Sequence, residues 1–144
     1  MWKVKERATF ELVKQKIVSM QDLEWAADDF SRYDASSHQV IAEFKYRYGN
    51  YPDTMIEKMK YDNLHRLAAG RAICYCVERE DGSIFLFNIN HLDSIQWDYN
   101  WHTRKCNETT VFERNEKIDK RVGMIRWDQA RTTINRHSGI VKQP

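Results

Sequence analysis

The strongest constraint on the fold of this chain is a ten-residue run, 38–47, with the length and side-chain types of a β-strand. The run is HQVIAEFKYR, and it is rich in β-branched and aromatic residues. Because strand side chains alternate between faces, Glu43 and Lys45 are predicted to share one face while Phe44 lies on the other. A carboxylate and an ammonium at the end of an apolar strand are costly to bury unless they pair, bind a metal or take part in chemistry.

A further carboxylate, Asp34, stands nine residues before Glu43, directly ahead of a polar turn. Two carboxylates and a lysine at this spacing are the minimal set for metal-dependent phosphodiester hydrolysis, since carboxylates supply the oxygen ligands that hard divalent ions prefer. Each residue also has an ordinary interpretation, in which Asp34 forms a turn and Glu43 and Lys45 form a surface pair. A Glu-x-Lys triplet also arises by chance, so the strand context is what favours the functional interpretation.

Helical and extended patterns alternate along the rest of the chain. The predicted elements are helices at 6–20 and 21–27, a strand at 30–35, the strand at 38–47, a helix at 54–69, strands at 72–78 and 83–89, a helical turn at 90–95, and strands at 109–112 and 122–127. Thr54 and Glu57 have the spacing of a capping box, and Asp81-Gly82 is a hairpin signal. The last eight or so residues are expected to be loosely held.

This order of elements predicts an α/β fold with a central mixed β-sheet flanked by helices. A chain of 144 residues is most simply one domain, 1–144. No stretch approaches the ~20 apolar residues of a membrane helix, and the N-terminus lacks a signal-peptide pattern, so we expect a cytoplasmic protein without a membrane partner. Cys74 and Cys76 share a predicted strand face and, with Cys106, are expected to be reduced thiols and not zinc ligands.

Charge is unevenly distributed although the formal net charge is only +2. Residues 22–43 include six acidic side chains and one basic side chain, whereas residues 114–142 include eight basic and three acidic ones. This polarity suits a metal centre at one end and phosphate contacts at the other. The alternative is that the basic region is only a solvated surface.

Three short segments resemble small phage-type members of the PD-(D/E)XK nuclease superfamily. They are RYDA at 32–35, IAEFKYR at 41–47 and IEKMKY at 56–61. The resemblance covers about residues 6–92, and residues 93–144 form a basic and aromatic extension beyond it. It implies a restriction-endonuclease-like core within the predicted α/β fold.

The resemblance also implies roles for residues of the central strand. Asp34 and Glu43 would bind Mg²⁺ or Mn²⁺, with the backbone carbonyl of Phe44 as a further ligand. Lys45 would orient or activate the attacking water and offset the charge that develops on the phosphate.

Two helices are expected to contribute further side chains. A carboxylate of the first helix completes such sites in the family, and Glu11 is the candidate here, with Glu6 as the alternative. In the helix after the strand, Lys60 would reach the scissile phosphate, and the alternative is an ordinary surface lysine.

The expected function is that of a metal-dependent endonuclease acting on duplex or branched DNA in the cytoplasm of a phage-infected or prophage-carrying cell. Cutting both strands would require a homodimer. One rival is an inactive module of the same fold that binds nucleic acid or a protein partner, and another is an assembly protein. The aromatic alternation of Trp97, Tyr99 and Trp101 suits either base stacking or a protein core.

Overall fold

The computed structural model describes residues 3–28, 30–107 and 117–144, whose strands form a seven-stranded and a three-stranded sheet. The helices are α1 (Val4–Lys16), α2 (Lys58–Ala68) and α3 (Ile89–Ser94), and 3₁₀ turns lie at Val18–Met20 and Trp127–Gln129. The strands are β1 (Glu24–Trp25), β2 (Ala35–Ser36), β3 (Val40–Arg47), β4 (Asp53–Glu57), β5 (Ala72–Arg79), β6 (Ser83–Asn88), β7 (His102–Asn107), β8 (Lys117–Arg126), β9 (Thr132–Asn135) and β10 (Gly139–Lys142).

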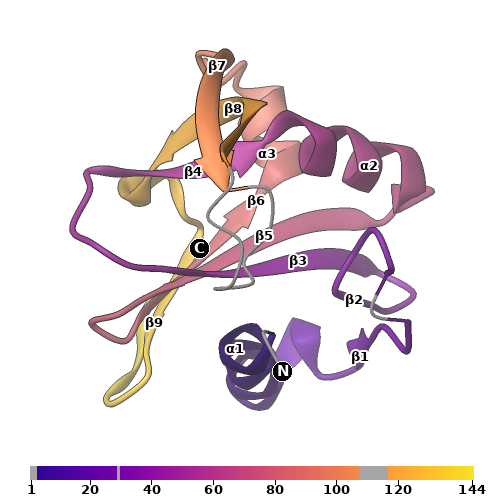
Figure 1. Cartoon of the computed structure of the whole chain (residues 1–144). Helices are drawn as coiled ribbons and strands as arrows, with labels where there is room; N and C mark the ends of the chain where they lie inside the picture. The colour runs from indigo at the N-terminus through magenta and orange to yellow at the C-terminus, as the bar shows by residue number, and fades with distance from the viewer. Residues whose placement is uncertain (1–2, 29, 108–116) are drawn as a thin grey trace.

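The seven-stranded sheet is mixed, as predicted, and has the order β1-β2-β3-β5-β6-β9-β10. β3 pairs with β5 in parallel through the crossover that contains β4 and α2, while its other neighbour, β2, is antiparallel. The smaller sheet has the order β4-β8-β7. In Figure 1, α1 lies below the large sheet, and α2, α3 and the small sheet lie above it.

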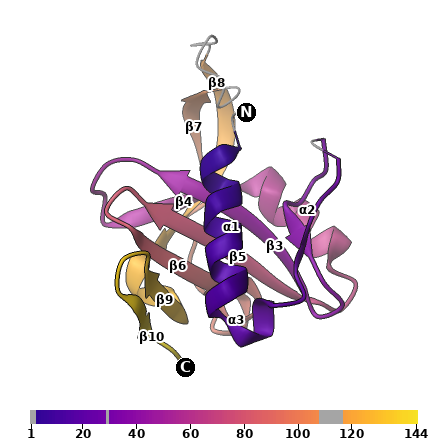
Figure 2. The same ribbon diagram turned by 90° about the horizontal axis from the view of Figure 1, so that it is seen from below.

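Two hydrophobic clusters hold these layers together, one on each face of the large sheet. α1 crosses one face, as the view from below shows (Figure 2), and packs Phe10 and Val13 against Phe44. On the other face, Leu64 of α2 packs with Ile41 of β3 and with the side chains of the small sheet. The predicted alternation of β3 is therefore confirmed, because Phe44 and Ile41 belong to opposite clusters.

Several predicted elements are confirmed. The helix expected at 6–20 is α1 followed by a 3₁₀ turn, and the helical turn at 90–95 is α3. β5 and β6 form the expected antiparallel hairpin, in which Gly82 has a φ of +87° that its hydrogen side chain allows. Among the described residues, no helix is both long and apolar enough to cross a membrane.

Other predicted elements differ from the structure or fall outside its described residues. The segment at 21–27 contains strand β1 and not a helix, and the strand at 30–35 begins only at Ala35, in β2. Thr54 and Glu57 do not form a capping box, because 53–57 is strand β4, which pairs with β8 along its whole length. The C-terminal residues expected to be loose contain β10, which pairs with β9. The expected strand at 109–112 lies outside the described residues, and 117–121 belongs to β8.

Candidate functional site

Asp34 is buried beside β3, directly before the two-residue strand β2. Its amide donates at 3.0 Å to the carbonyl of Ala42, the β3 residue that also pairs with Ala35 of β2. Its carboxylate Oδ2 then accepts the amide of Phe44 at 2.8 Å, so the side chain takes the place of a further paired residue. The amide and carbonyl of one strand residue point to the same side, so the Phe44 carbonyl opens onto the edge where Asp34 lies.

Glu43 is the neighbouring buried carboxylate on β3, with an exposed fraction of 2%. Its Oε2 atom lies 3.4 Å from Nζ of Lys60 on α2, whereas Oε1 is buried without a hydrogen-bond partner. Burial, and then the nearby charge of Asp34, raise the pKa of Glu43 to about 7. A bound cation would give the unpaired Oε1 atom a partner and would offset the negative charge of the two neighbouring carboxylates. Carboxylate oxygens are the ligands that Mg²⁺ and Mn²⁺ prefer.

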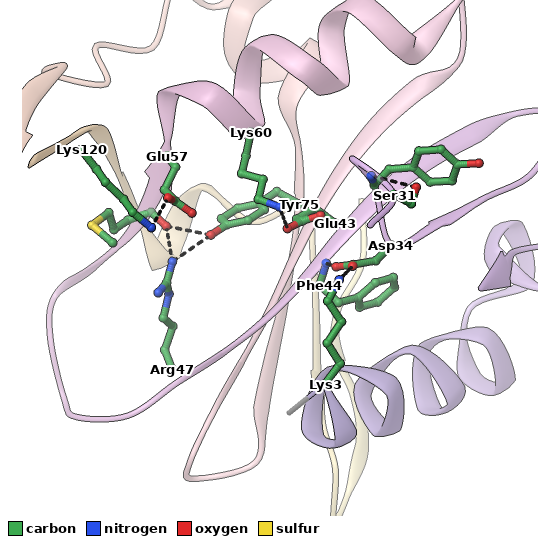
Figure 3. Close-up of polar contacts among 12 residues, drawn as sticks. Lys3, Ser31, Asp34, Glu43, Phe44, Arg47, Glu57, Lys60, Tyr75 and Lys120 are labelled. Carbon is green, nitrogen blue, oxygen red and sulfur yellow. Dashed lines mark hydrogen bonds and ion pairs between the residues drawn. The ribbon is translucent and has the colours of Figure 1, made fainter. Parts of the chain in front are cut away.

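The charges of three lysines, Lys3, Lys45 and Lys60, act on Glu43. Figure 3 shows two of them, Lys3 beside Asp34 and Lys60 beside Glu43. Lys3 places its Nζ atom 2.7 Å from Oδ1 of Asp34, and Lys60 pairs with Glu43. Lys45, half-buried on β3, has a lowered pKa because burial disfavours its charged form, an effect that Glu43 opposes and that the charges of Arg47 and Lys60 reinforce. A lysine with a lowered pKa gives up its proton more easily than a solvated one and can act on a nearby water.

A second polar group continues from the site toward the small sheet. Glu57, at the junction of β4 and α2, pairs with Lys120 of β8 at 2.8 Å. Burial opposes ionisation of Glu57, but the hydrogen bond from Lys120 and the charges of Lys45, Lys120 and Lys60 hold its pKa below the ordinary value. Arg47 donates to the carbonyl of Met55 at 2.9 Å and so fixes the end of β3 to β4.

The structure does not bring Glu11 to the site. It is exposed on α1 and pairs with Arg7 at 3.2 Å. Glu6 is half-buried, and its charge acts on Lys3, which contacts Asp34. Within the described residues, no three His, Cys, Asp or Glu side chains come together as a metal-ligand group. The oxygen donors at the site are therefore two carboxylates and the Phe44 carbonyl.

Sequence reasoning missed Lys3, Glu57 and Lys120. Lys3 lies one residue before α1 and seven before the buried Phe10, so extending the helical pattern by one turn would have placed it on the sheet-facing side. For Glu57, the sequence pattern predicts only a role in a helix cap. Lys120 meets Glu57 through the pairing of β4 with β8, which no local pattern reveals.

The aromatic alternation at 97–101 packs as core. Tyr99 is buried, and the indole of Trp97 donates to the carbonyl of Met124 at 2.9 Å. The ring of Trp101 stacks on Tyr99 with centroids 4.9 Å apart. These contacts fit the core interpretation of the segment better than an open stacking face for bases.

Comparison of the chain with protein-family models, with curated proteins and with solved structures yields no match.

Proposed function

We propose that this protein is a metal-dependent endonuclease that hydrolyses DNA phosphodiester bonds with Mg²⁺ or Mn²⁺. The observation that supports it best is the pair of buried carboxylates, Asp34 and Glu43, with the Oε1 atom of Glu43 left without a hydrogen-bond partner. The order of elements supports a restriction-endonuclease-like core. Helix α1, Asp34, the strand with Glu43 and Lys45, and the crossover helix α2 follow one another as that core requires.

In this proposal, each residue has a role that follows from its position. Asp34, Glu43 and the carbonyl of Phe44 hold the divalent ion, which when bound supplies Lewis-acid stabilisation of phosphoryl charge and lowers the pKa of water. Lys45 orients the attacking water and accepts its proton, a role that its lowered pKa favours. Lys60 binds a non-bridging phosphate oxygen from the α2 side.

The second candidate is a catalytically inactive module of the same fold that binds nucleic acid or a protein partner. One observation favours it. Nζ of Lys3 lies 2.7 Å from Asp34, so a lysine already compensates the negative charge of the carboxylate that would bind the metal ion. Lys3 must move away from Asp34 for the first candidate to operate, and it can stay in place for the second.

Plasmid cleavage separates the two candidates. We expect the purified protein to cut supercoiled plasmid with Mg²⁺ or Mn²⁺ and not with EDTA. Glu43→Gln and Lys45→Ala are each expected to lower the rate by at least about a hundredfold, since each removes a group that acts in the transition state. Glu24→Gln and Lys16→Ala, which make the same charge changes at exposed positions, serve as controls and should cut at the wild-type rate.

Two outcomes would sink the nuclease proposal: no cleavage by the wild type with either ion, or cleavage by both site variants at the wild-type rate. DNA binding without cleavage would support the inactive module.

A further inference from the structure

The paired strands β7 and β8, His102–Asn107 and Lys117–Arg126, form a ribbon that extends away from the body of the molecule (Figure 2). They contain six basic residues and one acidic residue, namely Arg104, Lys105, Lys117, Lys120, Arg121, Arg126 and Asp119. Since the whole chain has 23 basic and 21 acidic residues, the remainder is net negative. Positive charge is thus concentrated on these strands. Residues 108–116, which join them, are outside the described part of the chain and are not assigned to this surface.

One cross-strand pair on the ribbon is made of two cations. Arg104 of β7 lies directly opposite Lys120 of β8, so both side chains project from the same face. Like charges at such a position are destabilising. Glu57 compensates Lys120, but Arg104 is exposed and has no ion pair or hydrogen bond with any other described residue. An anion from outside the chain would relieve this repulsion.

The face that bears Arg104 and Lys120 leads to the candidate site. Lys120 pairs with Glu57, whose charge also interacts with Lys60, and Lys60 pairs with Glu43. Figure 3 shows Lys120, Glu57, Lys60 and Glu43 following one another across the site. A nucleic-acid strand whose phosphate lies at Glu43 would therefore find its next cationic partners along this row.

The opposite face of the ribbon provides a matched comparison. Lys105, the residue after Arg104, lies opposite Asp119 and forms an ion pair with it at 2.9 Å. Arg104 and Lys105 thus have the same charge and adjacent positions in β7, but only Lys105 already has an anionic partner within the ribbon.

We propose that Arg104 and Lys120 bind a backbone phosphate of the DNA strand. This phosphate is the neighbour of the scissile phosphate at the Asp34 and Glu43 site, so the ribbon positions the substrate. This inference rests on the proposed function for the identity of the ligand. Lys120 is a positioning residue as well, since it fixes Glu57 at the start of α2.

Binding of fluorescently labelled duplex DNA, followed by anisotropy in EDTA so that nothing is cut, tests the contact. Arg104→Ala should bind about tenfold more weakly than wild type, since it loses a charge-assisted hydrogen bond. The slope of log affinity against log salt should fall by about one, because one phosphate contact disappears. Lys105→Ala should differ little from wild type, and Arg104→Lys should keep the wild-type slope. Both positions are exposed, and circular dichroism confirms that the variants fold.

Equal losses of DNA affinity in Arg104→Ala and Lys105→Ala would overturn the inference, because they would show that the ribbon as a whole attracts DNA without a specific contact. Failure of the proposed function has a different signature. If wild type cuts plasmid and Arg104→Ala binds like wild type, the nuclease stands and the phosphate contact is wrong. If Arg104→Ala alone loses affinity but wild type never cuts, the contact stands in a binding module. A wild-type protein with no affinity for DNA would overturn both.

Discussion

At the scale of single residues, Glu43 makes the free energy of unfolding depend on pH, because its carboxyl is buried and its pKa is raised from 4.5 to about 7. Between these two pH values, the folded protein therefore retains a proton on Glu43 that the unfolded chain releases. Stability from this residue is fully present below pH of about 4.5 and is lost as pH rises through about 7. The loss amounts to about 3 kcal/mol, from 1.36 kcal/mol for each unit of pKa.

We therefore expect Glu43→Gln to be more stable than wild type above about pH 7 in EDTA, with the difference shrinking toward pH of about 4.5. Urea unfolding over this range measures it, and the exposed Glu24→Gln is the control. Added Mn²⁺ should stabilise wild type and not Glu43→Gln, because only an ionised carboxylate binds the ion well. A difference between wild type and Glu43→Gln that does not change with pH would contradict the burial argument.

The site residues that sequence could predict are those whose positions depend on local rules. Glu43 and Lys45 share a face because side chains alternate along one strand, and Asp34 is close to them in the chain. Lys3 was not predictable in the same way, since it reaches Asp34 only when α1 packs across the sheet. Glu11 lies on the exposed side of α1 beside Arg7, because a helix pattern predicts the apolar face of the helix but not which of its carboxylates comes close to the strand.

At the scale of elements, the segment 97–101 packs against β8 because β8 has a glycine where the segment crosses it. A Cβ atom on Gly123 would lie 2.8 Å from a ring carbon of Trp101 and 2.9 Å from the Cβ of Tyr99. The ring could turn aside, but the Cβ of Tyr99 moves only with its backbone. The absence of a side chain at Gly123 is therefore what lets the two elements approach.

Gly123→Ala is expected to destabilise the protein by about 1–3 kcal/mol, as overpacking of a close contact does. Urea unfolding followed by tryptophan fluorescence measures both the loss and any displacement of Trp101. Lys117→Ala, at an exposed position of the same strand, should change stability by less than about 0.5 kcal/mol. A fully stable Gly123→Ala protein would show that the segment is not held tightly on β8.

The clearest failure of sequence reasoning at this scale is the supposed capping box. Thr54 and Glu57 have the right spacing, yet Thr54 pairs with Ile125 and Glu57 with Val122. The long-range pairing with β8 decides the conformation of 53–57, and the helix starts only afterwards, at Lys58. Local spacing identified the helix but not its first turn, because the competing partner is far away in sequence.

At the scale of the whole molecule, one buried ion pair joins the two ends of the chain. Glu78 of β5, exposed by 4%, accepts two hydrogen bonds of 2.7 Å from the guanidinium of Arg136, which follows β9. The same carboxylate accepts the hydroxyl of Thr9 from α1 at 2.7 Å. The N-terminal helix, the centre of the sheet and the C-terminal strands thus share one carboxylate.

Removing one partner of such a pair leaves a buried charge uncompensated, so we expect Arg136→Ala to lower the free energy of unfolding by about 3 kcal/mol. This is the low end for buried pairs, because the Arg136 side chain is 32% exposed. Thermal and urea unfolding measure the loss. Adding Glu78→Met should recover most of it, since the uncompensated charge disappears. A double variant as unstable as the single one would show that the loss has another cause.

The C-terminal third illustrates why the overall sheet was harder to predict than its centre. β9 and β10 extend the large sheet beyond β6, although the last residues were expected to be loose. These strands are short, and β10 leaves Ile140 and Val141 exposed, so no strong alternation marks them. Their place in the sheet depends on β6 and on Arg136, contacts that join residues distant in the chain.

Chemical modification of the buried cysteines of β5 can report that the protein has opened. Burial raises the pKa of Cys74 to about 12 and that of Cys76 well above its ordinary value, so neither thiol forms the thiolate that oxidants and alkylating agents attack. Both side chains lie in the cluster beneath α1. Cys74 lines a surface pocket, whereas Cys76 has no exposed surface. A molecule modified at Cys76 must therefore have separated that helix from the sheet at least once, and the modification reports an opening that the folded protein does not display.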